Sequence, residues 1–175
     1  MKIYLLADNV RSCYNVGSLF RLADATAVTK LYLTGYTPYP LSDNDARPRY
    51  VAAKTSKEIA KTALESFNSV AWEHDEAAID LIEKLKKDGV TVVAVEQSSQ
   101  SINYINFIKS ITTKSQINIC FVLGHETEGL SKDVIKACDA AIEIPMLGAG
   151  KSLNVAMAAT VVIYSLLQLS SGGVA

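Results

Sequence analysis

Residues 118–137 read Asn-Ile-Cys-Phe-Val-Leu-Gly-His-Glu-Thr-Glu-Gly-Leu-Ser-Lys-Asp-Val-Ile-Lys-Ala. The run Asn118 to Leu123 is apolar with little alternation, which is typical of a strand buried on both faces of a sheet. Gly124 breaks this run, and Ser131 is a suitable N-cap for a helix that extends to Ala137. The stretch therefore predicts a buried strand, a tight turn and a helix, which are the parts of an α/β domain with a mostly parallel sheet flanked by helices.

The same alternation continues in both directions along the chain. Further strands are predicted over Lys2 to Ala7, Lys30 to Thr34, Ser69 to Trp72, Val90 to Val95 and Ala141 to Ile144. Further helices are predicted over Asn15 to Ala25, Ser56 to Leu64, Glu76 to Lys87 and Ser152 to Leu169, the last with Ser152 as its N-cap. With no repeat and no linker to divide it, the chain is expected to be a single domain over residues 1–175.

Two segments have a clear local pattern. In the helix predicted over Glu76 to Lys87, one face carries Ala78, Ile79, Ile82 and Leu85, and Gly89 follows its end. Gly35 to Arg49 is rich in Pro, Asp and Asn and is predicted to be a long loop. Loops of that length are often functional.

Composition excludes several classes of protein. The longest apolar run, Val155 to Leu167, is about 13 residues, whereas a membrane span needs roughly 20. The apolar stretch Ile3 to Ala7 is too short for a signal peptide, so we expect a cytoplasmic protein that does not enter a membrane. Cys13, Cys120 and Cys138 are odd in number and far apart, which argues for free thiols rather than disulfides or a zinc site.

The net charge is −1, which by itself argues against a strong nucleic-acid binder. The charge is unevenly distributed, however. Residues 1–61 hold nine Lys or Arg and five Asp or Glu, whereas residues 62–175 hold eight and thirteen. The first third is thus either a basic surface for an anionic partner or a set of scattered, solvated charges.

Three polar segments lie where a predicted strand ends and a helix begins, the usual place for ligands in open α/β sheets. In the first, Asn15, Ser18 and Arg21 are three residues apart and share nearly one helix face. An N-cap asparagine and a salt-bridged arginine would give the same spacing. In the second, Glu126 and Glu128 follow Gly124, either as acid–base groups, as metal ligands or as part of a solvated turn.

The third segment, Ile144 to Asn154, reads Ile-Pro-Met-Leu-Gly-Ala-Gly-Lys-Ser-Leu-Asn. Gly150-Lys151-Ser152 invites comparison with a phosphate-binding loop. That motif needs a glycine where this chain has Pro145, so ATPase or kinase function is not indicated. The chain also has no G-x-G-x-x-G fingerprint for a Rossmann cofactor site.

Together the three segments resemble the three motifs of the SpoU (TrmH-like) branch of the SPOUT methyltransferases. The first motif is matched by Asn15, Ser18 and Arg21, and the second by Gly124-His125-Glu126 with Gly129-Leu130-Ser131. The third is matched by Ile144-Pro145-Met146 with Ser152-Leu153-Asn154-Val155 and Ala158. Three motifs in order and at suitable separations are far more specific than one, and the resemblance covers essentially the whole chain.

The resemblance implies a parallel sheet whose C-terminal part forms a deep trefoil knot, and a homodimer whose interface includes the last helix. It also implies that S-adenosylmethionine binds without any metal. The residues that match the family's cofactor site are Val95, Gly124, Ile144, Met146, Ser152 and Leu153. The implied reaction is methylation of a ribose 2'-hydroxyl in structured RNA, either tRNA or rRNA.

By the same resemblance, Arg21 is the catalytic arginine, as a base or as an electrostatic stabiliser. Asn15, Glu126, Ser152 and Asn154 complete the catalytic set. With no separate RNA-binding extension, RNA recognition is expected from this domain's own basic residues, namely Arg11, Arg47, Arg49 and Lys54. The alternatives are a non-catalytic relative that keeps the knot as a scaffold, and a methyltransferase that acts on an RNA base or a non-RNA substrate.

Overall fold

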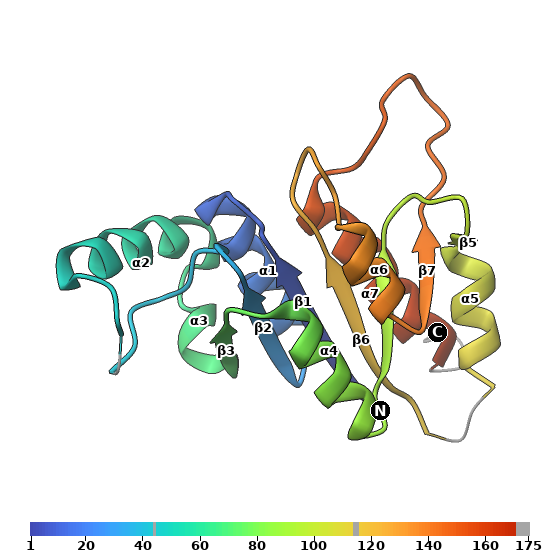
Figure 1. Cartoon of the computed structure of the whole chain (residues 1–175), viewed down its shortest axis with the longest axis horizontal. Helices are drawn as coiled ribbons and strands as arrows, with labels where there is room; N and C mark the ends of the chain where they lie inside the picture. Colours follow the sequence, from blue (N-terminus) through green and yellow to red (C-terminus); the bar gives the residue numbers. More distant parts are fainter. Residues whose placement is uncertain (44, 114–115, 171–175) are drawn as a thin grey trace.

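The computed structural model of the chain describes residues 1–43, 45–113 and 116–170. Within these residues seven strands form one parallel sheet in the order β3-β2-β1-β6-β4-β7-β5 (Figure 1). The strands are β1 (Lys2–Asp8), β2 (Lys30–Thr34), β3 (Trp72–Asp75), β4 (Thr91–Val95), β5 (Ile102–Asn103), β6 (Asn118–Leu123) and β7 (Ala140–Glu143). The helices are α1 (Cys13–Ala25), α2 (Arg49–Ala63), α3 (Ser66–Ser69), α4 (Ala78–Lys87), α5 (Tyr104–Ile111), α6 (Lys132–Ala137) and α7 (Val155–Ser170).

The sheet has a hydrophobic core on each face, which explains its continuous apolar strands. In β6, Phe121 packs on the side covered by α1, α5 and α7, while Val122 packs on the side covered by α4 and α6. Successive side chains of a strand point to opposite faces, so both must be apolar when helices cover both faces. The expected parallel sheet with flanking helices is therefore confirmed.

Several predicted elements are confirmed at their ends. The strands β2 and β6 have the predicted bounds, and Ser131 caps α6 by accepting a hydrogen bond from the Val134 amide at 3.2 Å. Gly89 has φ +77°, the left-handed conformation that favours glycine after a helix, and it follows α4 as predicted. On α4 the buried face holds Leu81 in place of Ile79, which is exposed.

Other elements differ from the prediction. The helix α1 begins at Cys13, two residues early, because the Ser12 hydroxyl caps it by accepting from the Asn15 amide. The helix α2 begins at Arg49 instead of Ser56, directly after Pro48, whose fixed φ suits a helix start. The strand predicted over Ser69 to Trp72 is wrong, because its first residue ends α3 and only its last belongs to β3.

The last third of the chain holds two more differences. The helix α7 begins at Val155, so Ser152 does not cap it as predicted. Asn154 does so instead, because its Oδ1 accepts from the amides of Ala156 and Met157. The short strand β5 and the helix α5 were not predicted. None of the helices in the described residues is long and apolar enough to cross a membrane.

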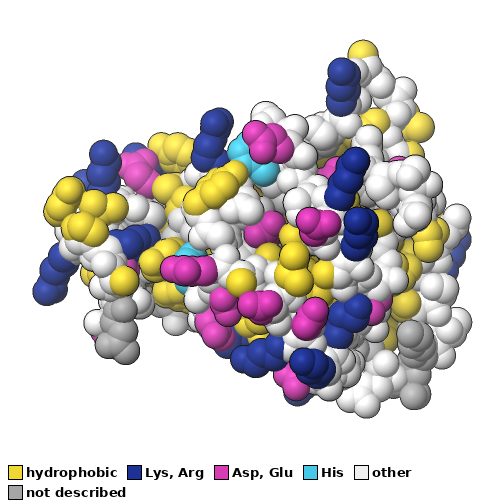
Figure 2. All heavy atoms as spheres, in the orientation of Figure 1, with side chains coloured by type: hydrophobic (Ala, Val, Ile, Leu, Met, Phe, Trp, Pro, Cys, Tyr) yellow, Lys and Arg dark blue, Asp and Glu magenta, His cyan; other side chains and the backbone are white. Residues whose placement is uncertain are grey.

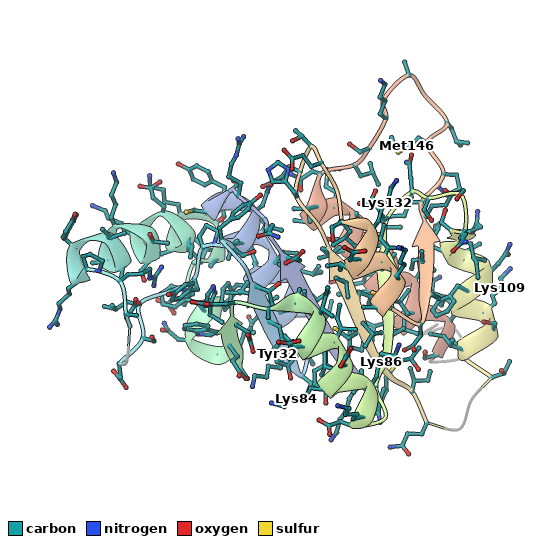
Figure 3. The ribbon with its side chains drawn as sticks, in the orientation of Figure 1. Tyr32, Lys84, Lys86, Lys109, Lys132 and Met146 are labelled. Carbon is teal, nitrogen blue, oxygen red and sulfur yellow. The ribbon has the colours of Figure 1, made fainter. Side chains whose placement is uncertain are left out.

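The long loop between β2 and α2 leads to one end of the molecule, where α2 projects from the sheet (Figure 1). Figure 2 shows several Lys and Arg side chains around this end. The lysines of α4 and α6, among them Lys84, Lys86 and Lys132, lie instead on the helices that cover one sheet face (Figure 3). Lys86 is paired there with Asp139 at 3.0 Å.

Candidate active site

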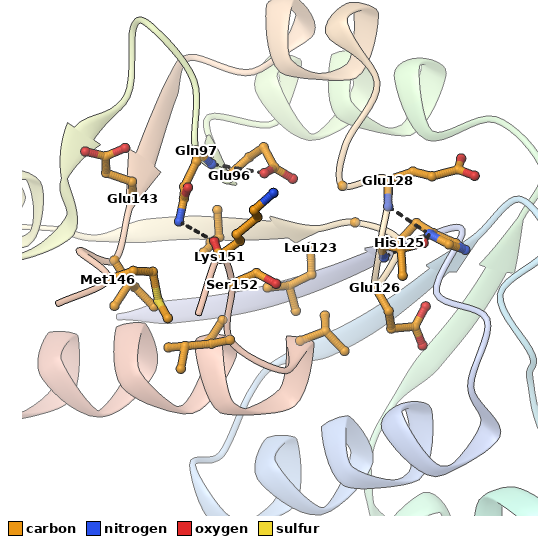
Figure 4. A pocket seen from close by; sticks show the side chains of 18 of the residues that line it. Glu96, Gln97, Leu123, His125, Glu126, Glu128, Glu143, Met146, Lys151 and Ser152 are labelled. Atoms are coloured by element: carbon orange, nitrogen blue, oxygen red, sulfur yellow. Dashed lines mark hydrogen bonds between the residues drawn. The ribbon is translucent and has the colours of Figure 1, made fainter. Parts of the chain in front are cut away.

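A cleft of about 260 Å³ lies beyond the carboxyl ends of β4, β6 and β7 (Figure 4). In a parallel sheet these ends share one edge, so the residues that follow each strand meet there. The lining comes from three separate stretches, which are Val95 to Gln97, Leu123 to Gly129 and Ile142 to Ala158. The second and third of these contain the motifs singled out in the sequence.

All six residues expected to hold the cofactor line this one cleft: Val95, Gly124, Ile144, Met146, Ser152 and Leu153. Met146 lies on the loop between β7 and α7 (Figure 3). Apolar side chains form much of the wall, while Glu96, Glu128 and Glu143 add carboxylates around it. An apolar wall suits an adenine ring and carboxylates suit a cation, so this lining is chemically compatible with S-adenosylmethionine.

The turn after β6 forms one wall of the cleft and is held by close backbone packing. A Cβ on Gly124 would lie only 2.6 Å from the carbonyl carbon of Gly129 and from the amide of Leu130. Gly129 has φ +69°, and its neighbour Leu130 donates its amide to the Glu96 carboxylate at 2.9 Å. The turn therefore requires both glycines, and Glu96 on the adjacent strand end fixes its position.

A chain of hydrogen bonds joins the three motifs beside this turn. The Asn154 amide donates from Nδ2 to Oδ1 of Asn15 at 2.9 Å, and Asn15 donates in turn to the Glu126 carboxylate at 2.7 Å. The same carboxylate accepts the backbone amides of Arg11 and Ser12, each at 3.0 Å. Glu126 therefore anchors the start of α1, and the expected grouping of Asn15, Glu126 and Asn154 is present.

The charge on Glu126 is stabilised by this network. Burial alone would raise its pKa, but the Arg11 amide and the Asn15 side chain, with further backbone donors, more than compensate and lower it. Glu126 is thus a carboxylate at neutral pH. It serves as an acceptor that aligns α1, and we do not assign it the role of a proton donor.

Arg21 lies on α1 but does not line the cleft. It is exposed, and it makes no side-chain hydrogen bond or ion pair with the part of the chain that the structure describes. The structure therefore does not show the salt-bridged arginine that the spacing alone would also have allowed. Arg21 follows Asn15 by six residues, about 9 Å along the helix axis and about 120° around it, so the two residues do not share one face as predicted.

The residues expected to bind RNA fall into two groups. Arg11, Arg49 and Lys54 are exposed. Arg47 differs from these three residues, because its guanidinium is engaged within its own loop. Its guanidinium binds the Asp45 carboxylate at 2.6 Å and 2.8 Å, donates to the Tyr39 and Pro40 carbonyls, and stacks on the Tyr39 ring.

Arg47 therefore holds the loop between β2 and α2 together. Its hydrogen bonds to Asp45 lower the pKa of that carboxyl, as expected for a nearly buried ion pair. A guanidinium has five N–H donors, and four hydrogen bonds within the loop use most of them. The sequence could not reveal this, because Arg47 and Asp45 are close together in a loop without periodicity.

Three residues of the site were not assigned a role from the sequence. Glu96 and Gln97 follow β4, and the Gln97 amide donates to the Lys151 carbonyl at 3.1 Å. His125 accepts the Thr127 and Glu128 amides at Nδ1, each at 3.1 Å. The sequence signal for Glu96 and Gln97 was their position directly after an apolar strand. A single histidine in a turn does not by itself indicate a role for His125.

The cysteines are free, and Cys120 is fully buried in β6. Among the residues with described positions, no group of His, Cys, Asp or Glu is arranged to hold a metal ion. The polar side chains that line the cleft are carboxylates, the Gln97 amide, His125, the hydroxyls of Thr127 and Ser152, and the ammonium of Lys151.

Comparison with known proteins identifies relatives over nearly the whole chain. A tRNA (guanosine(18)-2'-O)-methyltransferase of Aquifex aeolicus is 28% identical over 165 residues, which is 93% of this chain and 67% of the relative. A protein named as a TrmH family tRNA/rRNA methyltransferase of Staphylococcus aureus is 26% identical over 164 residues. That match covers 94% of this chain but only 58% of the relative's length.

The fold has the same relatives. The crystal structure of the A. aeolicus TrmH/SpoU tRNA-modifying enzyme matches with a TM-score of 0.77 at 23% identity, covering 98% of this chain and 76% of that one. At that identity the likeness concerns the fold alone. The model of the SpoU rRNA methylase family matches residues 2–164, which include all three motifs and every strand of the sheet. The chain belongs to the SpoU rRNA methylase family.

Proposed function

We propose that this domain transfers a methyl group from S-adenosylmethionine to a ribose 2'-hydroxyl of tRNA or rRNA. The observation that carries the proposal is the hydrogen-bond chain from Asn154 through Asn15 to Glu126, beside a cleft lined by all six expected cofactor residues. The 2'-O-methyltransferase name of the Aquifex relative supports the ribose as target. The chain spans 58% of the length of the first curated relatives, so we propose the activity for this domain alone.

The cofactor, when bound, would supply a methyl group on a sulfonium; transfer to the ribose oxygen breaks the carbon–sulfur bond, leaves a neutral thioether and releases the hydroxyl proton to water. The residues that would hold it are those of the cleft wall, with Val95, Ile144, Met146 and Leu153 against the adenine and Ser152 at the edge. Backbone groups at the end of β4 and in the loop between β7 and α7 would provide the hydrogen bonds that select a base in such pockets.

The protein must align the hydroxyl for attack and stabilise the negative charge that develops on its oxygen. Arg21 is an exposed cation on α1, the helix that also carries Asn15. A guanidinium has a pKa above ~12 and rarely gives up its proton. We therefore assign Arg21 the role of stabilising the developing alkoxide or gripping the neighbouring phosphate, and we assign Asn15, Glu126 and Asn154 the role of fixing α1 against the cleft.

RNA is proposed to bind along the basic N-terminal third, through Arg11, Arg49 and Lys54, which are all exposed. Cations there neutralise phosphates and release counterions, so affinity should fall as salt rises. No separate extension is required for this role. We propose a cytoplasmic location as well, which the proposed tRNA or rRNA substrate supports.

We also propose the C-terminal knot of the family. In support, residues 96–101 contact both the end of β7 and the loop that follows it: Ser101 donates to the Glu143 carboxylate at 2.7 Å, and Gln97 donates to the Lys151 carbonyl. A crystal structure with residues 96–117 and 143–155 traced would test whether the second segment passes through the first.

The working unit is proposed to be a symmetric homodimer. The helix α7 exposes Met157 and Tyr164 (58% and 49%) although its other face is buried in the core. An exposed apolar stripe on a buried helix is typical of an interface. Light scattering at micromolar protein should give twice the 18.9 kDa chain mass, and a monomer mass would reject the dimer.

The experiment that tests the function is transfer of labelled methyl from S-adenosylmethionine to unmodified tRNA transcripts and protein-free rRNA. Incorporation supports the proposal. Binding of RNA without incorporation would favour the non-catalytic relative, and label on a base would favour the base methyltransferase.

A further inference from the structure

Tyr36 is an exposed aromatic residue beside the cleft. It lies directly after β2, with 59% of its surface exposed. Its ring stands edge-on to that of His125, with ring centroids 6.3 Å apart and an interplanar angle of 75°. His125 lines the cleft, so Tyr36 stands at the junction between the candidate cofactor site and the basic N-terminal third.

The backbone that carries this ring is held firmly. The Tyr36 amide donates to Oδ1 of Asn9 at 3.2 Å, and Gly35 packs against the same side chain with φ +63°. On the other side Thr37 is buried, where its hydroxyl donates to the Ala7 carbonyl and accepts from the Val10 amide, both at 3.0 Å. The chain thus fixes both neighbours of Tyr36 while leaving its ring exposed.

The ring that supports Tyr36 is fixed as well. His125 accepts two backbone amides at Nδ1, so the proton of the neutral imidazole lies on Nε2. An edge-to-face contact covers at most one face of the tyrosine ring, and the exposure of Tyr36 leaves aromatic surface available to a ligand. A rigid aromatic face in this position costs little conformational entropy when a planar group stacks on it.

The electrostatic surroundings also suit a nucleotide. Partial burial and then Glu128, Glu126 and Asp8 raise the pKa of Tyr36, whereas Arg11 lowers it. The phenol is therefore neutral, and the three carboxylates that act on it make the base, rather than the phosphate, the part of a nucleotide that suits this ring. Arg11 acts on the same hydroxyl, which places an exposed cation near the ring.

We propose that the face of Tyr36 is a stacking platform for a nucleobase of the RNA substrate, at or next to the methylated nucleotide. Single-stranded RNA is recognised largely by bases that leave the helix and stack on aromatic side chains. Every base has a flat π-face, so the platform selects an unpaired nucleotide rather than one base. The inference rests on the proposed function, because it names how that site receives its substrate.

The test is a substitution series at Tyr36, measured as methyl transfer to whichever RNA the wild-type protein labels. Tyr36→Phe keeps the flat ring and should retain at least about half of the wild-type kcat/KM. Tyr36→Leu keeps apolar bulk without a flat face, and Tyr36→Ala removes both. These two variants should lose roughly 10- to 100-fold in kcat/KM, mainly through a higher KM for RNA.

Cofactor affinity, measured by titration with S-adenosylhomocysteine, should be unchanged throughout the series. Equal KM values for the wild type and Tyr36→Ala would overturn the platform. So would an activity of Tyr36→Leu equal to that of Tyr36→Phe, because bulk and not stacking would then suffice. Absence of RNA labelling by the wild type would instead reject the proposed function itself, so the two failures are distinguishable.

Discussion

Nδ2 of Asn154 lies 2.9 Å from Oδ1 of Asn15, a hydrogen bond between residues 139 positions apart. Asn154 caps α7 through its Oδ1, and Asn15 lies in the first turn of α1. The bond therefore ties the starts of two helices that cover the same sheet face. Because Asn15 also donates to Glu126, any change at Asn15 affects all three motifs at once.

The first prediction concerns Asn15→Asp. The new carboxylate would face that of Glu126, with which Asn15 now shares a 2.7 Å hydrogen bond. Like charges at such a distance raise the pKa of one partner. Methyl transfer should fall by about 100-fold at pH 8, the scale for losing one aligned contact. The ratio of variant to wild-type rate should rise as pH falls toward 6. Asn15→Ala is the control and should show no such recovery; a pH-independent ratio for Asn15→Asp would contradict the argument.

Glu126→Gln should lower thermal stability in a pH-dependent manner. The pKa of Glu126 is lowered in the folded protein, so its charge adds stability that is fully present above the ordinary value of 4.5. That contribution is lost as pH falls through the lower, folded pKa. The difference in Tm between the wild type and Glu126→Gln should therefore be largest near pH 7 and narrow below about pH 4.5. A difference that stays constant down to pH 3 would exclude this role of the charge.

Gly124→Ala should disrupt cofactor binding through the turn, not by filling the cleft. The new Cβ would meet the backbone at Gly129 and Leu130 at 2.6 Å, and backbone cannot move aside without shifting the wall. We expect at least a tenfold loss of affinity for S-adenosylhomocysteine by titration calorimetry. Gly150→Ala is the matched control, because its Cβ would meet only the Met146 Cε, at an ordinary 3.6 Å. Equal affinities of the two variants would refute the close-packing argument.

Arg47→Ala should lower stability, whereas Arg49→Ala with Lys54→Ala should lower RNA affinity. Arg47→Ala leaves the nearly buried Asp45 carboxylate without its partner, at a cost of about 2 kcal/mol. That cost corresponds to a fall in Tm of roughly 4–8 °C for a domain of this size. The double variant, which removes two exposed cations of α2, should leave Tm nearly unchanged. It should lower the affinity for RNA and make that affinity less dependent on salt. The assignment fails if Arg47→Ala leaves Tm unchanged, or if the α2 pair binds RNA like the wild type.

Much of the sheet could be predicted because its strands are continuous apolar runs bounded by glycine or polar residues. The run of β6, for example, ends at Gly124, and its predicted bounds are confirmed. The helix starts were harder, since several polar residues competed as N-caps. Ser12 rather than Asn15 caps α1, and Asn154 rather than Ser152 caps α7. The capping hydrogen bonds of Ser12 Oγ and Asn154 Oδ1 distinguish these candidates, and sequence alone does not show them.

The sequence motifs predicted which residues form the candidate site. They did not predict the contacts between the motifs. The cleft brings together the six expected cofactor residues, because strand ends of a parallel sheet share one edge. Local sequence does not show that Glu96 holds the Leu130 amide, or that Arg47 is used within its own loop. These contacts join residues with no periodic relation, so spacing arguments cannot reach them.

The most direct test of the account is to locate the transferred methyl group. RNA methylated by the protein with trideuteromethyl-labelled S-adenosylmethionine would be digested to nucleosides and analysed by mass spectrometry. We expect the label on the ribose of a 2'-O-methylated nucleoside. We also expect Arg21→Ala, which should keep fold and cofactor affinity, to reduce that signal by at least about 100-fold, with little rescue by Arg21→Lys. Label found on a base, or undiminished ribose labelling by Arg21→Ala, would contradict the account.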